Sequence, residues 1–438
     1  SVDLYVDDIV SAAKLVIVRL LGGAGYWPYG LERVVACCRS RHIPFAVIPG
    51  DDQPDPELAA LCSLPPSDWQ RIWQYLVHGG AGNYAALLRN CASLIGHDAD
   101  WTEPAPLVRA GLYWPGQTTP DLDAVRATWA DGAPVAALTF YRALVQAGTT
   151  APIDAMIAAL GARGLNPLPL HVASLKDPVC AEIVRGLLGE TQPDIILNAT
   201  GFAVSSPGSA RQETPFDAAD CPILQVVFSG GTEEAWRAGT HGLSARDIAM
   251  NVALPEVDGR VLTRAVSFKA EAKYDAATQS SIVTYRTVTD RVDFVAELAS
   301  RWANLRATPV VERRVAVVLA NYPTRDGRIG NGVGLDTPAG TIEVLRALDG
   351  AGYDIKTIPA SGNDLIEQLS AGPTNAPGPR TNGARFALGD YQAWFNRRPA
   401  ALRDAVTARW GPPEQDPYFA DGAFVLAVRA YGNITVCI

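Results

Sequence analysis

Two carboxylates stand close together in the segment NVALPEVDGR, residues 251–260, where one residue separates Glu256 from Asp258. An apolar run precedes them and a second, at 261–268, follows, so the pattern predicts two strands joined by an Asp-Gly turn. Carboxylate oxygens accept protons and bind divalent cations weakly enough to release them. Asp-Gly is also common at the solvated tip of a hairpin. The residue types alone leave both interpretations open.

Aromatic side chains follow predicted strands and could stack on a flat ligand. Tyr26, Trp27 and Tyr29 lie in a glycine-rich loop after one strand, and residues 198–202 form a similar loop further along. Ligands of α/β folds bind at such carboxyl ends of strands. Arg19 could pair with a carboxylate of the same ligand. Packing between domains would use these residue types equally well, and it stands as the alternative.

The sequence contains no phosphate-binding loop. A P-loop needs Gly-Lys followed by Ser or Thr, and no lysine here follows a glycine. Gly327, Gly330, Gly332 and Gly334 resemble a dinucleotide-binding turn, but their spacing does not fit G-x-G-x-x-G. We therefore expect no ATP hydrolysis by this chain, and we interpret the glycines as a sharp turn or a close approach of the backbone to a ligand.

Strands that alternate with helices must position these side chains. The alternation predicts several doubly wound α/β domains with mostly parallel sheets and an antiparallel insertion near 230–290. We expect three domains, at 1–105, 106–311 and 312–438, the last truncated at its C-terminal end. An apolar, β-branched run predicts a strand at 14–21. Further apolar runs predict strands at 43–48, 109–114, 135–138, 166–171, 194–198, 223–228, 261–268, 282–287, 314–321, 354–358 and in a hairpin at 424–438.

Composition limits the class of protein. The 438 residues include 19% charged side chains and carry a net charge of −9, which argues against nucleic acid as a partner. No apolar run could span a bilayer and no export signal precedes the first helix, so we expect a cytoplasmic protein with reduced cysteines. The chain stops inside a predicted strand, which is typical of a fragment because an unpaired apolar edge is a liability.

The segment NVALPEVDGR resembles a signature of the large subunits of aerobic cobaltochelatases and of the related magnesium chelatases. Four further segments resemble the same family, and together they cover nearly the whole chain. They are RLLGGAGYWPYG at 19–30, PGDD at 49–52, NATGF at 198–202 and the glycine-rich segment at 321–338. The resemblance is to the N-terminal part of the cobalt enzyme's large subunit.

This resemblance implies an activity and partners. The large subunit would hold hydrogenobyrinic acid a,c-diamide, a corrin-ring precursor of vitamin B12, while cobalt(II) is inserted as a substrate. The reaction is that of a ligase forming nitrogen–metal bonds. Two ATPase-type partner subunits would carry the ATP and magnesium. A magnesium-chelatase large subunit that binds protoporphyrin is one alternative. A non-catalytic α/β module that binds a ligand or a partner is another.

The resemblance also implies site residues. Glu256 is the first candidate for a base that takes ring N–H protons or passes the metal, and Asp258 is the second. His241 lies in a loop leading into this segment, and imidazole suits cobalt, so it is the candidate metal ligand. The candidates for contact with the ring are Arg19, Tyr26, Trp27, Tyr29, Asn198, Thr200, Phe202 and Asn331.

Overall fold

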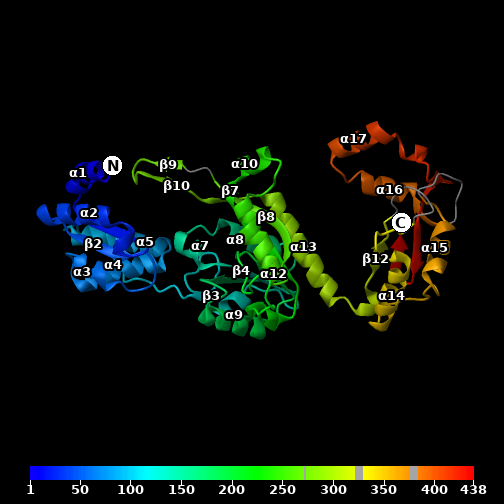
Figure 1. Cartoon of the computed structure of the whole chain (residues 1–438), viewed down its shortest axis with the longest axis horizontal. Helices are drawn as coiled ribbons and strands as arrows, with labels where there is room; N and C mark the ends of the chain where they lie inside the picture. The colour runs from blue at the N-terminus through cyan, green and yellow to red at the C-terminus, as the bar shows by residue number, and fades with distance from the viewer. Residues whose placement is uncertain (271–272, 321–328, 375–382) are drawn as a thin grey trace. The chain divides into compact units, whose positions relative to one another are not determined.

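The computed structural model describes residues 1–270, 273–320, 329–374 and 383–438. The chain divides into two compact units, Ser1–Asn304 and Leu305–Ile438 (Figure 1). Among the described residues, no helix is long and apolar enough to cross a membrane. The division into three domains stays a prediction.

The first unit begins with a pair of parallel strands, β1 and β2, whose two faces are both covered. Alternate residues of β2 point to opposite faces. Phe45 and Val47 belong to a core with α2, whereas Ala46 and Ile48 belong to a core with α4 and α5. The elements of this segment are α1 (Val2–Asp8), β1 (Val16–Leu20), α2 (Pro28–Ser40), β2 (Phe45–Pro49), α3 (Pro56–Leu61), α4 (Pro66–His78) and α5 (Ala81–Leu94).

A seven-stranded sheet follows, in the order β11-β8-β7-β6-β4-β5-β3. Its strands run parallel from β5 to β8, and the edge strands β3 and β11 are antiparallel. The strands are β3 (Ala110–Leu112), β4 (Val135–Tyr141), β5 (Asn166–Val172), β6 (Ile195–Asn198), β7 (Ile223–Thr232), β8 (Val261–Lys269) and β11 (Tyr285–Thr287). The predicted class, a mostly parallel α/β sheet, is confirmed.

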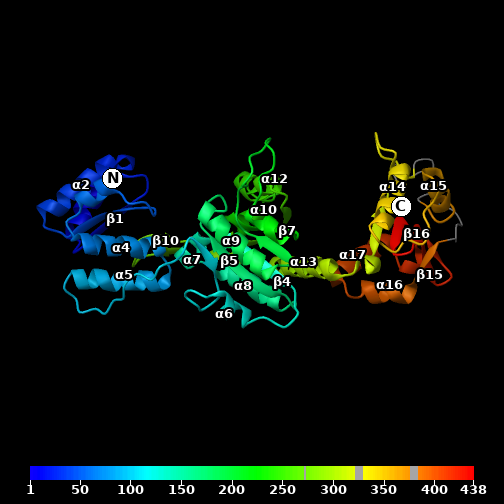
Figure 2. The ribbon, with the colours of Figure 1, turned by 90° about the horizontal axis from the view of Figure 1, so that it is seen from below.

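Helices cover both faces of this sheet, as Figure 1 shows for α8 and α9 on either side of β4. One core joins α8 and α13 to the sheet, and the other joins α9 to it. The sheet and α13 can be followed from a second direction in Figure 2. The helices are α6 (Leu122–Arg126), α7 (Arg142–Ala147), α8 (Ala151–Gly161), α9 (Pro178–Thr191), α10 (Glu233–Ala238) and α13 (Thr289–Ala307).

The strand order reverses at β4. The next strand along the chain, β5, lies on one side of β4, and the one after it, β6, lies on the other. The loops that leave β4 and β6 therefore diverge. Open α/β sheets bind ligands in the crevice that forms at such a point, outside the carboxyl ends of the strands.

The prediction of a hairpin around Glu256 is wrong. Residues 245–257 are helical, in the order α11 (Ala245–Ile248), a π-helical turn (Ala249–Ala253) and α12 (Leu254–Val257). Ser244 starts this helix by accepting a hydrogen bond from the Asp247 amide. Gly259 then ends it with a φ of 79°, and β8 continues parallel to β7. A short apolar run fits a buried helix as well as a strand, so periodicity could not separate them.

Antiparallel pairing does occur near 230–290, but it lies after β8. The strands β9 (Lys273–Asp275) and β10 (Ser280–Ile282) form an antiparallel pair. β11 then pairs antiparallel with β8 at the edge of the large sheet. The predicted departure from the parallel pattern is therefore confirmed.

The described residues of the second unit form two small sheets, ordered β12-β17-β16 and β13-β15-β14. The expected hairpin at 424–438 is divided, because β15 belongs to one sheet while β16 and β17 belong to the other. β17 is a central strand, paired parallel with β12 and antiparallel with β16. The strands are β12 (Val315–Val318), β13 (Ala384–Ala387), β14 (Phe419–Ala420), β15 (Ala423–Leu426), β16 (Val428–Tyr431) and β17 (Ile434–Cys437).

The strand expected at 354–358 is absent from the described structure of this unit. The Asp354 carbonyl accepts one hydrogen bond from the Asn433 amide, and no ladder follows. Part of the glycine-rich segment, 321–328, lies outside the described residues and includes Gly327. The helices of the unit are α14 (Thr337–Gly350), α15 (Gly362–Ser370), α16 (Leu388–Phe395) and α17 (Ala400–Trp410).

Candidate functional site

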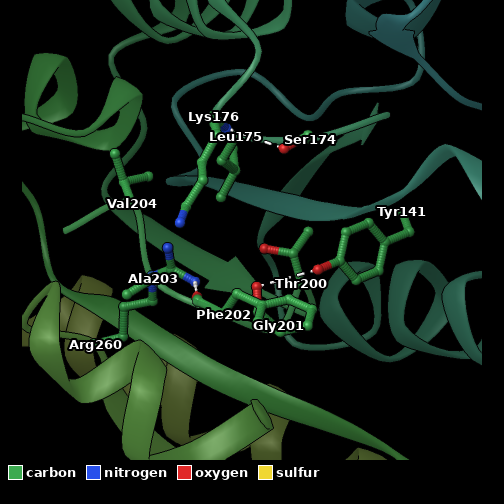
Figure 3. Close-up of a pocket in the computed structure, with 10 residues that line it drawn as sticks. All are labelled: Tyr141, Ser174, Leu175, Lys176, Thr200, Gly201, Phe202, Ala203, Val204 and Arg260. Carbon is green, nitrogen blue, oxygen red and sulfur yellow. Dashed lines mark hydrogen bonds between the residues drawn. The ribbon is translucent and has the colours of Figure 1, made fainter. Parts of the chain in front are cut away.

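A cavity of about 120 Å³ lies where the loops after β4, β5 and β6 meet (Figure 3). Tyr141 ends β4, residues 174–176 follow β5, and residues 200–204 follow β6. Arg260, the residue before β8, completes the lining with its long side chain. We call this the smaller cavity, and we call residues 199–204 the Phe202 loop. The cavity lies in the crevice that the strand order predicts.

Buried amide side chains fix the start of the Phe202 loop. Asn198 Nδ2 donates to the Thr200 carbonyl at 2.9 Å and to Gln225 Oε1 at 2.8 Å. Thr200 Oγ1 donates back to Asn198 Oδ1 at 2.9 Å. The Tyr141 hydroxyl donates to the Gly201 carbonyl at 3.1 Å, and burial raises the pKa of this phenol. The loop is therefore held in one conformation by satisfied, buried polar groups.

Phe202 has an unusual backbone conformation and an exposed ring. Its φ is 62°, in the left-handed region that non-glycine residues rarely adopt. Its amide donates to the Met250 carbonyl at 2.7 Å, and its carbonyl accepts from Arg260 Nη1 at 3.2 Å. The side chain is nevertheless 47% exposed. Contacts on both sides hold a strained residue so that its ring faces outward.

Asp258 and Arg260 form a fully buried ion pair beneath this loop. Arg260 Nη2 lies 2.8 Å from Asp258 Oδ2. The same carboxylate accepts hydrogen bonds from the Val204 amide at 2.7 Å and the Ser205 amide at 3.0 Å. Burial lowers the pKa of the Arg260 guanidinium, although the Asp258 charge opposes that shift. The pair ties the signature segment to the Phe202 loop.

A larger cavity, of about 450 Å³, adjoins the smaller one, and Tyr141 lines both. The buried Asp247 carboxylate on its wall accepts from Ser229 Oγ at 2.8 Å and from Asn251 Nδ2 at 3.2 Å. Asn251 belongs to the π-helical turn, and such turns are frequent at functional sites. A Cβ on Gly201 would approach Asn251 Oδ1 to 2.8 Å, so only glycine fits there.

Glu256 and His241 are both exposed and line neither cavity. Glu256 lies on α12, and its side chain makes no hydrogen bond or ion pair with the described residues. His241 lies in the loop between α10 and α11. In the part of the chain that the structure describes, no three His, Cys, Asp or Glu side chains gather as a metal site. The roles of both residues stay predictions.

The N-terminal candidates lie in the β1–α2 region and line neither cavity. Arg19 Nη2 donates to the Gly50 carbonyl at 2.8 Å, and the Tyr29 hydroxyl donates to Asp3 at 2.9 Å. The Trp27 indole covers Gly30, where a Cβ would approach the ring to 1.9 Å. Tyr26 is 77% exposed. Arg19, Trp27 and Tyr29 are thus engaged with their own segment, and none of the four lines the smaller cavity with Thr200 and Phe202.

Asn331 is exposed and belongs to the second unit, whereas Asn198 is buried and supports the loop from below. The smaller cavity also has lining residues that the sequence did not single out: Tyr141, Ser174 and Lys176. Each lies at or just after the carboxyl end of β4 or β5, a position shared with Thr200 after β6. This shared position could have identified these residues from the sequence. Recognising it would have required knowing that β4, β5 and β6 are neighbours in the sheet.

Comparisons with known proteins agree on one family. The family model described as CobN/Magnesium Chelatase matches residues 73–438. The aerobic cobaltochelatase subunit CobN of Sinorhizobium sp. is 47% identical over 100% of this chain, which spans 35% of that relative. A magnesium-chelatase subunit of Rhodobacter capsulatus is 27% identical over 84% of this chain and 32% of its own length.

A solved structure gives the same result for the fold. The catalytic subunit of cobaltochelatase from Mycobacterium tuberculosis matches 99% of this chain and 36% of its own, with a TM-score of 0.73 and 30% identity. The chain thus spans about a third of the length of each of these three proteins. The family model, the identities and the shared fold together establish that this chain belongs to the CobN/magnesium chelatase family.

Proposed function

We propose that this chain forms part of the ring-binding surface of a cobaltochelatase large subunit, which inserts cobalt(II) into hydrogenobyrinic acid a,c-diamide in cobalamin biosynthesis. The identity of 47% to a cobaltochelatase subunit, against 27% to a magnesium-chelatase subunit, favours cobalt over magnesium as the substrate metal. The longer subunit would act as a ligase, and the ring would contact this chain at the Phe202 loop.

The outward presentation of Phe202 is the observation that supports this proposal. A left-handed conformation costs a non-glycine residue roughly 1–2 kcal/mol. Leaving this residue 47% exposed also forgoes part of the gain from burial. A flat conjugated macrocycle stacked on the ring would recover that burial, since aromatic faces favour offset stacking. Strain that persists beside a cavity at a strand switch point is typical of a binding site.

In this proposal Glu256 is the acid–base or metal-passing residue. The α12 helix that carries it is joined to the Phe202 loop through Met250 and Arg260. An exposed, unpaired carboxylate near the ring could accept N–H protons or briefly ligate cobalt. We assign Asp258 as a positioning residue, because its oxygens are engaged by Arg260 and two backbone amides. His241, in the loop before α11, is the candidate for an early contact with the incoming cobalt.

The proposal assigns ATP hydrolysis to other chains. This sequence has no Gly-Lys phosphate loop, so ATP and magnesium would be bound by two ATPase-type partner subunits. We place the complex in the cytoplasm.

Absorbance titration tests the proposal. The chain should bind hydrogenobyrinic acid a,c-diamide more tightly than protoporphyrin, with a shift in the visible bands. Phe202→Ala should weaken binding, whereas Tyr274→Ala, which removes an aromatic residue that is 63% exposed on β9, should not. Tighter binding of protoporphyrin would favour a magnesium-chelatase subunit. Absence of binding by either ring would reject the proposal and favour a module that docks a partner.

A further inference from the structure

Two cations border the smaller cavity, and the first of them, Lys176, has no acidic partner among the described residues. The adjacent carboxylate, Asp177, is already engaged. It lies 2.8 Å from Arg109 Nη2 and accepts from the Cys180 amide at 2.9 Å. The Ser174 hydroxyl accepts from the Lys176 amide at 3.1 Å, and its own proton has no acceptor in the described part of the chain. The Lys176 ammonium is thus free to bind a ligand.

The second cation, Arg260, is 2% exposed and only partly satisfied. Its Nη2 pairs with Asp258, its Nη1 donates to the Phe202 carbonyl, and its Nε is buried without a hydrogen-bond partner. Figure 3 shows its guanidinium and the Lys176 ammonium pointing toward each other. Two positive groups that face one another repel, and an anion in the cavity would relieve that repulsion.

We propose that the smaller cavity binds a peripheral carboxylate of the macrocycle, with Lys176 and Arg260 as its cationic partners. This inference rests on the proposed function, because it names the part of the ring that docks here. The cavity has room for a carboxylate and its adjoining carbon atoms, and none for a macrocycle. Leu175 and Val204 provide apolar contact for those carbons. The carboxylate would anchor the ring edge while the ring face lies against Phe202.

Competitive labelling of lysines tests this directly. The chain is treated with a trace of an amine-acylating reagent, and the modification of Lys176 and Lys273 is quantified by mass spectrometry. Lys273 is an exposed lysine on β9 that lines neither cavity, so it serves as the internal reference. The additions are hydrogenobyrinic acid a,c-diamide, its methyl ester, acetate and phosphate, each at the same ionic strength. Ring binding is followed in parallel by absorbance.

The diamide and acetate should slow labelling of Lys176 relative to Lys273, and the methyl ester should not. In titrations, Lys176→Gln should reduce the preference for the acid over its ester about tenfold, the usual scale for a hydrogen bond to a charged group. Lys273→Gln should leave that preference unchanged. If phosphate protected Lys176 from labelling and acetate did not, the assignment of the cavity to a carboxylate would be overturned.

The outcomes separate the two proposals. If the diamide binds by absorbance but leaves Lys176 labelling and the acid preference of Lys176→Gln unchanged, the carboxylate site is wrong while the ring-binding function stands. If no macrocycle binds, the proposed function fails. The labelling experiment with acetate then tests by itself whether the cavity binds an anion. Protection by acetate would support it, and equal labelling of both lysines would reject it.

Discussion

The Phe202 loop and the loop that carries Tyr26 share a position after a strand and the same residue types, but they have different surroundings. Both follow a parallel strand, both contain glycine, and both expose an aromatic ring. The Phe202 loop borders a cavity with buried charges, and its aromatic residue is strained. In the N-terminal loop, Tyr29 and Trp27 contact their own segment, at Asp3 and Gly30. The difference suggests that aromatic residues after a strand indicate a site only where strand order opens a crevice.

The largest expected effect is on stability beneath the Phe202 loop. Asp258→Ala leaves Arg260 as an uncompensated buried charge, which should cost about 3–5 kcal/mol of the free energy of unfolding. Glu234→Ala breaks a pair whose members are 54% and 61% exposed, and it should cost less than about 1 kcal/mol. Urea unfolding measures both. Equal losses would mean that the buried pair does not hold this loop.

The next effect concerns chemistry near the same loop. In the longer subunit, assayed with its partners, ATP and cobalt, Glu256→Gln should lower insertion about 100-fold, the scale for removing a positioned acid or base. Ring affinity should change little, because glutamine keeps the size of the side chain but takes no proton. Wild-type turnover would remove Glu256 from the mechanism. Lost affinity with normal turnover at saturation would make it a contact residue.

A smaller effect separates the strain on Phe202 from its stacking. Phe202→Ala should weaken ring binding up to about tenfold, consistent with the energy of an aromatic contact. Phe202→Gly should weaken binding similarly, yet be about 1 kcal/mol more stable than Phe202→Ala, because glycine accepts a φ of 62°. Calorimetric unfolding and the absorbance titration together give both numbers. Equal stability of the two variants would argue against stored strain.

The smallest effect on macrocycle binding and stability is expected in the N-terminal loop that carries Tyr26. Tyr26→Ala should leave both macrocycle affinity and stability nearly unchanged, because Tyr26 is 77% exposed and borders neither cavity. The same titration applies. Weakening comparable to that of Phe202→Ala would show that the N-terminal loop also contacts the ring, and the contrast between the two loops would then fail.

The sequence predicted the sheet well and the site only in part. Apolar runs such as 166–171 and 223–228 form largely buried strands, as expected. The apolar run before Glu256 predicts a strand but is helical, because helical and extended apolar runs of that length look alike. Thr200 and Phe202 were candidates and do border the cavity. Lys176 and Tyr141 were missed, because their proximity depends on the reversal of strand order at β4.

Asp258 illustrates a second limit of the sequence. Its spacing from Glu256 suggested a shared chemical role, yet one side chain is exposed and the other buried. Neighbouring positions at the end of a helix point in different directions, so closeness in sequence does not imply a shared environment. Only the contacts of Asp258 with Val204, Ser205 and Arg260 reveal what it holds.

The two backbone hydrogen bonds that hold Phe202 also restrict insertions and deletions in the segment between their partners. Met250 holds the amide of that residue and Arg260 holds its carbonyl, and the π-helical turn and α12 fill the distance between them. Adding or deleting one residue in that interval would rotate one of the two contacts away by about 100°, the angle per residue of a helix. Exposed positions such as Ala253 can exchange side chains freely. Between Met250 and Arg260 we therefore expect the number of residues to be more constrained than their identity.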